Sequence, residues 1–307
     1  MTRGADALLA MARLAARGLR SPKPGASPSP APRRRIAVER RDVAPAPERL
    51  TRYLRATDGT RIAAFRGAEA RLPPLYSATW ETSAALELLA QLAESLPSVG
   101  GVVHLESEVV PLRPLRPGDR VRCRLELERV DETPRGARVQ VAARSWNGAE
   151  QLCSQGSAVF LVRTRERPPA GGGGRPRDRE PEPPPAGEGW AEVARWRLGS
   201  GAGRRYALAS GDFNPIHLWG WTARPFGFPR PILHGFCTAA MVAHALVEHR
   251  LGGDPGALRR LRIAFRAPLL LPARVRLLAG EEGGRHAFRV TDEEGARTFA
   301  EGDFAGE

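Results

Sequence analysis

Two long apolar helical runs, one in each half of the chain, dominate the hydrophobic pattern. The first is WETSAALELLAQLAESL, residues 80–96, and the second is GFCTAAMVAHALVEHRL, residues 235–251. The second run is apolar on almost every side, which is typical of a buried helix rather than one docked on a surface. Gly252 and Gly253 follow this run directly, and they predict where the helix ends.

After each helical run, apolar and polar residues alternate, as they do in half-buried strands. Turn sequences such as DETPRG, EEGG and DEEG separate these segments. The predicted strands are 101–112, 119–130, 137–146 and 150–163 in the first half, and 258–271, 273–281, 285–292 and 297–305 in the second. Each half therefore predicts one long helix wrapped by a curled antiparallel sheet, an α+β fold.

Two segments have the composition of disordered chain. Residues 21–35 are dense in Pro and Ser, and residues 165–189 consist largely of Pro, Gly and charged residues. We therefore expect an N-terminal helix and tail over 1–35, a domain over 36–164, a linker over 165–189 and a second domain over 190–307. The Ala, Leu and Arg of the first twenty residues would also suit an organellar transit peptide, but arginine is abundant throughout.

The net charge of +13 at first suggests anionic partners. Lys23 is the only lysine among 47 basic residues, and such an arginine excess is typical of GC-rich genes, so we expect no nucleic-acid partner. A phosphate-bearing ligand or an acidic carrier protein would still be attracted. Three cysteines at wide spacing favour a reducing, cytoplasmic setting over a disulfide framework. No apolar run approaches the ~18 residues that span a bilayer, so we expect no membrane association.

The stretch YALASGDFNPIH, residues 206–217, carries the first candidate chemistry. Asn214 and Pro215 are residues typical of a helix start, and they predict a short helix over 215–222 with His217 in its first turn. The positive end of that helix would disfavour an imidazolium and keep His217 neutral. Asp212 and a neutral His217 around one water form a general acid/base pair, although Asp and Asn also serve as structural residues at such junctions.

A second stretch, GFPRPILHGFCTAA, leads into the buried helix at residues 227–240. Backbone N–H groups in the first turn of a helix have no partners within it, so Gly235 N–H is a candidate donor to a substrate oxygen. The alternative is that Gly235 only eases the turn. We expect His234 to bond the backbone near the turn and His244 to be a core residue, and we expect no metal site.

Together these stretches resemble the signature of the MaoC-like, R-specific enoyl-thioester hydratases and dehydratases, roughly S-G-D-x-N-P-x-H and then R-P-I-x-H-G. The resemblance implies a hot-dog fold and no cofactor. It implies that Asp212 and His217 hold the reacting water and that Gly235 N–H polarises the thioester carbonyl. Asn214 would orient the loop and the water, and the expected substrate contacts are Asn214, Ile232, His234 and Phe236. Some family members have a helix serine where this chain has Ala243.

The first half departs from this signature. YLRATDGTR, residues 53–61, faintly echoes YALASGDFN, but no Asn or His follows at the required spacing, and the first histidine of this half is His104. The first half therefore resembles a hot-dog domain without the pair, and the whole chain resembles the double hot-dog dehydratases, in which two such domains in one chain mimic the dimer of single-domain relatives. This implies the reversible dehydration of (3R)-hydroxyacyl thioesters of coenzyme A or acyl carrier protein, and the expected assembly is a homodimer. A hot-dog thioesterase and a non-catalytic acyl-thioester-binding protein are the alternatives.

Overall fold

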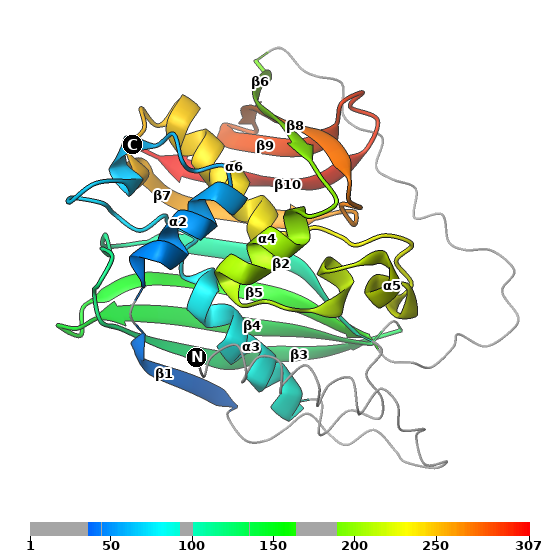
Figure 1. Ribbon diagram of the computed structural model, residues 1–307, viewed down its shortest axis with the longest axis horizontal. Helices are drawn as coiled ribbons and strands as arrows, with labels where there is room; N and C mark the ends of the chain where they lie inside the picture. Colours follow the sequence, from blue (N-terminus) through cyan, green and yellow to red (C-terminus); the bar gives the residue numbers. More distant parts are fainter. Residues whose placement is uncertain (1–35, 44, 93–100, 135, 164–188) are drawn as a thin grey trace, which may run out of the picture.

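The computed structural model describes residues 36–43, 45–92, 101–134, 136–163 and 189–307 (Figure 1). The tail expected over 1–35 and nearly all of the linker expected over 165–189 lie outside the described residues. Within the described part of the chain, no helix is long and apolar enough to cross a membrane.

The two halves share an order of elements: one strand comes first, the helices follow, and the other four strands come last. The first half contains β1 (Ala37–Val43), α2 (Pro47–Ala56), α3 (Ala78–Leu92), β2 (Gly101–Pro111), β3 (Val121–Thr133), β4 (Gly136–Asn147) and β5 (Leu152–Arg163). The second half contains β6 (Ala191–Leu198), α4 (Ala202–Ser210), α5 (Gly220–Ala223), α6 (Gly235–Arg250), β7 (Leu258–Phe265), β8 (Ala273–Glu282), β9 (Arg285–Asp292) and β10 (Thr298–Gly306). One-turn 3-10 helices lie at Ala63–Phe65, Pro215–His217, Arg224–Phe226 and Pro255–Ala257.

All ten described strands form one antiparallel sheet in the order β1-β3-β4-β5-β2-β7-β10-β9-β8-β6. The five strands of each half are contiguous, and the halves join where β2 pairs with β7 from Glu106 opposite Ala264 to Val109 opposite Leu261. Four strands therefore follow the long helix of each half, as the alternating pattern predicts. The pattern did not identify β1 and β6, which precede the helices and form the two edges of the sheet.

The central helix of the second half, α6, lies in the core, as its all-round apolar surface predicts. Eleven of its residues are buried, from Cys237 to Val247 without a break. Gly252 and Gly253 end the segment with φ of +61° and +79°, a conformation that costs glycine little. The central helix of the first half, α3, packs against β3 and β1 (Figure 1).

The short helices α2 and α4 pack on each other where the halves meet (Figure 1). Arg49 of α2 donates from Nε to the Ala209 carbonyl, at 2.7 Å, and from Nη2 to the Ser210 carbonyl, at 2.6 Å. These are carbonyls at the C-terminal end of α4, where a cation is favourable. The first half thus fixes the end of the helix that leads into the candidate catalytic loop.

Candidate active site

Three hydrogen bonds from backbone N–H groups to side-chain oxygens hold the loop that carries Asp212. The helix α4 ends at Gly211, whose φ of +84° is the left-handed conformation that favours glycine. Asp212 N–H donates to Ser210 Oγ at 3.1 Å, Asn214 N–H donates to Asp212 Oδ1 at 3.1 Å, and Ile216 N–H donates to Asn214 Oδ1 at 3.3 Å. Each polar side chain therefore satisfies a backbone donor two residues on, which fixes the loop.

The helix predicted over 215–222 is wrong as a single element. Asn214 does cap a helix start, but it is a 3-10 turn of three residues, Pro215–His217, and the separate short helix α5 begins at Gly220. The turn packs closely against α4. A Cβ on Gly203 would lie only 2.1 Å from the His217 carbonyl oxygen, so α4 approaches this turn more closely than any side chain would allow.

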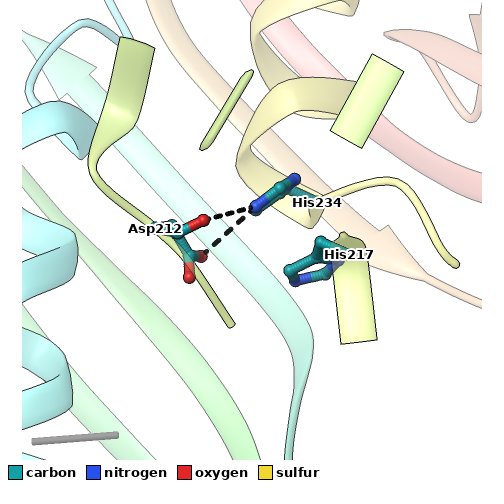
Figure 2. A group of neighbouring side chains, drawn as sticks. All are labelled: Asp212, His217 and His234. Atoms are coloured by element: carbon teal, nitrogen blue, oxygen red, sulfur yellow. Dashed lines mark hydrogen bonds and ion pairs between the residues drawn. The ribbon is translucent and has the colours of Figure 1, made fainter. Parts of the chain in front are cut away.

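Three side chains converge at the end of this loop: Asp212, His217 and His234 (Figure 2). The two imidazole rings are stacked, with their centroids 3.6 Å apart. His234 Nε2–H donates to the backbone carbonyl of Asp212 at 3.0 Å and lies 3.9 Å from its Oδ2. His234 therefore bonds the backbone, as expected, and in doing so it ties the start of α6 to the catalytic loop.

The hydrogen bonds of His217 indicate its tautomer. Its Nδ1 lies 2.9 Å from the Ile232 carbonyl, which can only accept, so the ring proton is on Nδ1 and Nε2 has a free lone pair. Burial, assisted by the neighbouring His234, lowers the pKa of His217 to about 3. The imidazole is therefore neutral, but the expected cause is wrong, because burial and not a helix end is the main reason.

Asp212 responds to the same environment in the opposite direction. Burial raises the pKa of its carboxyl, while the nearby His217 and the Asn214 N–H oppose this increase. Burial therefore disfavours the charged form of each group, the carboxylate of Asp212 and the imidazolium of His217. The pair combines a carboxyl group that can donate a proton with an imidazole nitrogen that can accept one.

The pair opens into a cavity of about 310 Å³. Every site residue that the sequence predicts lines it: Asp212, Asn214, His217, Ile232, His234, Gly235 and Phe236. Its other walls come from both halves, and the first half contributes residues that sequence analysis did not identify, including Thr82, Leu86, Val102, His104 and Phe160. Apart from the isolated histidine at 104, no local motif marks these residues, because strand pairing and helix packing bring them here.

Gly235 is the first residue of α6, and no side chain caps this end of the helix. Its N–H is a candidate donor at the cavity wall. The structure also shows a steric reason for a glycine at this position. A Cβ on Gly235 would lie 2.6 Å from Nδ1 of His104 and 3.0 Å from the Phe265 ring, so a side chain has no room.

Potential ligand atoms of Asp212, His217 and His234 lie within 4.8 Å of one another, a spacing at which a cation could be held. Two of the four ring nitrogens, however, face backbone carbonyls and carry protons. Only His217 Nε2 and His234 Nδ1 would remain as imidazole ligands. This stacked arrangement suits proton transfer by His217 Nε2 better than the tetrahedral coordination of a zinc ion.

Comparison with known proteins shows what the second half of the chain resembles. Residues 181–301, which contain the whole of this loop and α6, match the family model of the MaoC like domain. The chain is 34% identical over 184 residues to the 3-hydroxyacyl-thioester dehydratase X of Mycobacterium tuberculosis, an alignment that covers 60% of this chain and 61% of that relative.

Solved structures identify the fold of both halves. A crystal structure of HtdX from Mycobacterium tuberculosis matches 88% of this chain and 100% of its own, with a TM-score of 0.68 and 23% identity. Another Mycobacterium tuberculosis protein, described as having a double hot-dog fold, matches 86% of this chain and 92% of its own, with a TM-score of 0.58 and 12% identity. The chain thus has a double hot-dog fold, as expected.

Proposed function

We propose that this chain catalyses the reversible dehydration of (3R)-hydroxyacyl thioesters to trans-2-enoyl thioesters. One observation carries the proposal: Asp212, the free Nε2 of His217 and the first N–H of α6 line one largely apolar cavity. The similarity to a relative named as a 3-hydroxyacyl-thioester dehydratase supports the same activity. Family resemblance, geometry and protonation state therefore all favour one reaction class.

In the proposed mechanism, His217 Nε2 removes the proton from C2 of the acyl chain. Negative charge then develops on the thioester oxygen, where the Gly235 N–H stabilises it. The C2–C3 double bond forms as the C3–O bond breaks, and Asp212 donates its proton to the departing hydroxyl, which leaves as water. Transfer of the proton from His217 to Asp212 restores the pair, and hydration follows the same steps in reverse.

The structure favours this reaction over the two alternatives. In a non-catalytic binding protein we would expect the pair to be separated, but its ligand atoms lie within 4.8 Å. A thioesterase would need a water aimed at the carbonyl carbon and has no use for a second proton-transfer group at C3. A likeness to an acyl-ACP thioesterase, with a TM-score of 0.51 and 9% identity, extends to the fold alone.

The carrier, assembly and location are also part of the proposal. A net charge of +13 suits the phosphates of coenzyme A and the acidic surface of an acyl carrier protein. We further propose that the enzyme acts in the cytoplasm and forms a homodimer.

The test is to incubate the protein with crotonyl-coenzyme A and to follow the loss of the conjugated enoyl absorbance. We expect a (3R)-hydroxybutyryl product, which a dehydrogenase specific for the (3S) isomer leaves unoxidised. Rapid oxidation by that dehydrogenase would contradict the stereochemistry. Release of free coenzyme A would instead support the thioesterase alternative.

A further inference from the structure

One cavity residue of the first half, His104, stands against the candidate oxyanion donor of the second. It lies on β2, where the register with β5 shifts between His104 and Glu106. Such irregularities re-aim side chains and are common beside active sites. The pairing of β2 with β7 begins at Glu106, so His104 lies just beyond the seam that joins the halves.

Polar and aromatic contacts hold the His104 ring in one orientation. Its Nε2 lies 3.0 Å from the Glu106 carbonyl and 2.8 Å from Ser107 Oγ. The carbonyl can only accept, so the ring proton is on Nε2, and Nδ1 is the unprotonated nitrogen. Three phenylalanine rings surround the imidazole at centroid distances of 4.5–5.0 Å: Phe160, Phe236 and Phe265.

This fixed ring occupies the space beside Gly235 at the start of α6, where any side chain would have to fit. Its Nδ1 is the atom nearest to where a Cβ on Gly235 would lie, at 2.6 Å, and the Phe265 ring is the next residue, at 3.0 Å. His104 and Gly235 both line the cavity that contains the catalytic pair. A shift of the ring would therefore change where the first turn of α6 can sit.

We propose that His104 is a positioning residue for the reaction: anchored at Nε2, its ring sets the place of Gly235 and hence of the N–H that faces the thioester oxygen. The inference rests on the proposed function. It assigns the half without the catalytic pair a part in the chemistry, because a donor must lie within a few tenths of an ångström of its productive position to be effective.

The first experiment compares Gly235→Ala, His104→Ala and the double variant with the wild-type protein. In Gly235→Ala the added Cβ would displace the backbone, and with it the N–H that it carries. We expect this variant to lower kcat by at least ~10²-fold, the scale for loss of an oxyanion donor. His104→Ala should lower kcat about tenfold with little change in KM, because it affects a donor used most strongly in the transition state. The double variant should be at least about fivefold more active than Gly235→Ala, because it removes the nearest clash.

Phe160→Ala combined with Gly235→Ala is the matched control, since Phe160 packs on the His104 ring but is not among the atoms nearest to that Cβ position. Equal recovery in this control would mean that general loosening, and not the His104 contact, relieves the clash. A double variant with His104→Ala that is no better than Gly235→Ala would overturn the proposal.

A second comparison tests the Nε2 anchor. His104→Gln retains an N–H that can reach the Glu106 carbonyl, whereas His104→Phe retains the ring volume without a donor. We expect the glutamine variant to keep more of kcat, and the reverse order would contradict an anchored positioning role. Melting temperatures of all variants test the place of the His104 ring separately from the proposed function. If the wild-type protein were inactive on enoyl thioesters, the proposed function would fail, and recovery of the Gly235→Ala melting temperature by His104→Ala would still show whether this ring occupies the Cβ space.

Discussion

The loops after α2 and α4 occupy corresponding places in the two halves but have different uses. Each helix is followed by a residue in the left-handed conformation, Asp58 with φ of +56° and Gly211 with φ of +84°. The next residue is Gly59 in the first half and Asp212 in the second. Asp212 faces the cavity, whereas Asp58 accepts a hydrogen bond from the Trp196 indole of the other half at 3.0 Å.

Each half also places a histidine, His244 buried and His104 half-buried, against a glycine of the other. The ring of His244, on α6, lies 2.6 Å from where a Cβ on Gly59 would be, and its Nδ1 bonds the Thr57 carbonyl at 3.0 Å. Likewise, Nδ1 of His104 lies 2.6 Å from where a Cβ on Gly235 would be. In the first half the imidazole fills the space where the second half has the Asp212 side chain, and in the second it adjoins the proposed active site. The same loop thus has a structural use in one half and the proposed catalytic use in the other.

Removing one half gives the largest expected effect. Residues 189–307 alone would expose the β7 edge that β2 covers and would lose the cavity walls of the first half. We expect this fragment to aggregate, or to self-associate into a dimer that restores the packing, with no detectable turnover as a monomer. Size-exclusion chromatography and the crotonyl-coenzyme A assay measure this. A monomeric, fully active fragment would show that the first half is dispensable.

Replacing the catalytic pair comes next. Asp212→Asn and His217→Ala should each lower kcat by at least ~10²-fold, the scale for a positioned acid or base. Their effects should be strongly non-additive, because both residues act in one proton transfer sequence. Asp58→Asn, in the matching loop, is the control and should leave kcat unchanged. Near-wild-type turnover of a folded Asp212→Asn or His217→Ala variant would show that the assignment is wrong.

The pH dependence of stability should reveal the buried imidazoles of both halves. Burial lowers their pKa values, to about 3 for His104 and His217 and to about 4 for His234 and His244. The unfolded chain binds these protons near pH 6.5, whereas the native state binds them only near pH 3–4. Each histidine therefore lowers the free energy of unfolding by up to about 1.4 kcal/mol per pH unit as the pH falls through that window.

Two buried carboxyls act in the opposite sense. Burial raises the pKa of Asp212, and it raises that of Glu81 to about 7, so the native state takes up these protons before the unfolded chain does. The four histidines outnumber them, and we expect urea unfolding to show a net loss of stability from pH 6.5 to 4.5. His244→Gln keeps a donor to the Thr57 carbonyl. It should reduce the slope of the free energy of unfolding against pH by the contribution of about one proton. An unchanged slope would mean that His244 is not held neutral.

The smallest effect concerns the contact between Asp58 and Trp196. Asp58→Ala should lower the free energy of unfolding by about 1 kcal/mol, because it removes the hydrogen bond from Trp196, while the exposed ion pair with Arg61 that is lost with it contributes little. Asp58→Asn keeps an acceptor oxygen and should lower the free energy of unfolding by less than Asp58→Ala does. Equal stability of all three proteins in urea would show that this bond does not help to join the halves.

The amino-acid sequence was sufficient for the features that depend on neighbouring residues. Apolar periodicity identified both long helices and the strands that follow them, and Gly252 and Gly253 marked the end of α6 correctly. The loop that carries Asp212 and Asn214 is held by hydrogen bonds that span two residues, so the local motif already specifies its shape. The first part of the family signature covers this same stretch.

Only the tertiary structure decided the rest. The Ile232 carbonyl sets the tautomer of His217, burial rather than a helix end lowers its pKa, and the predicted helix is divided into a 3-10 turn and α5. His104 reaches Gly235 because β2 pairs with β7. These contacts join residues far apart in the chain, and no local pattern can encode them, because the energy of burial and close packing depends on every element that surrounds the site.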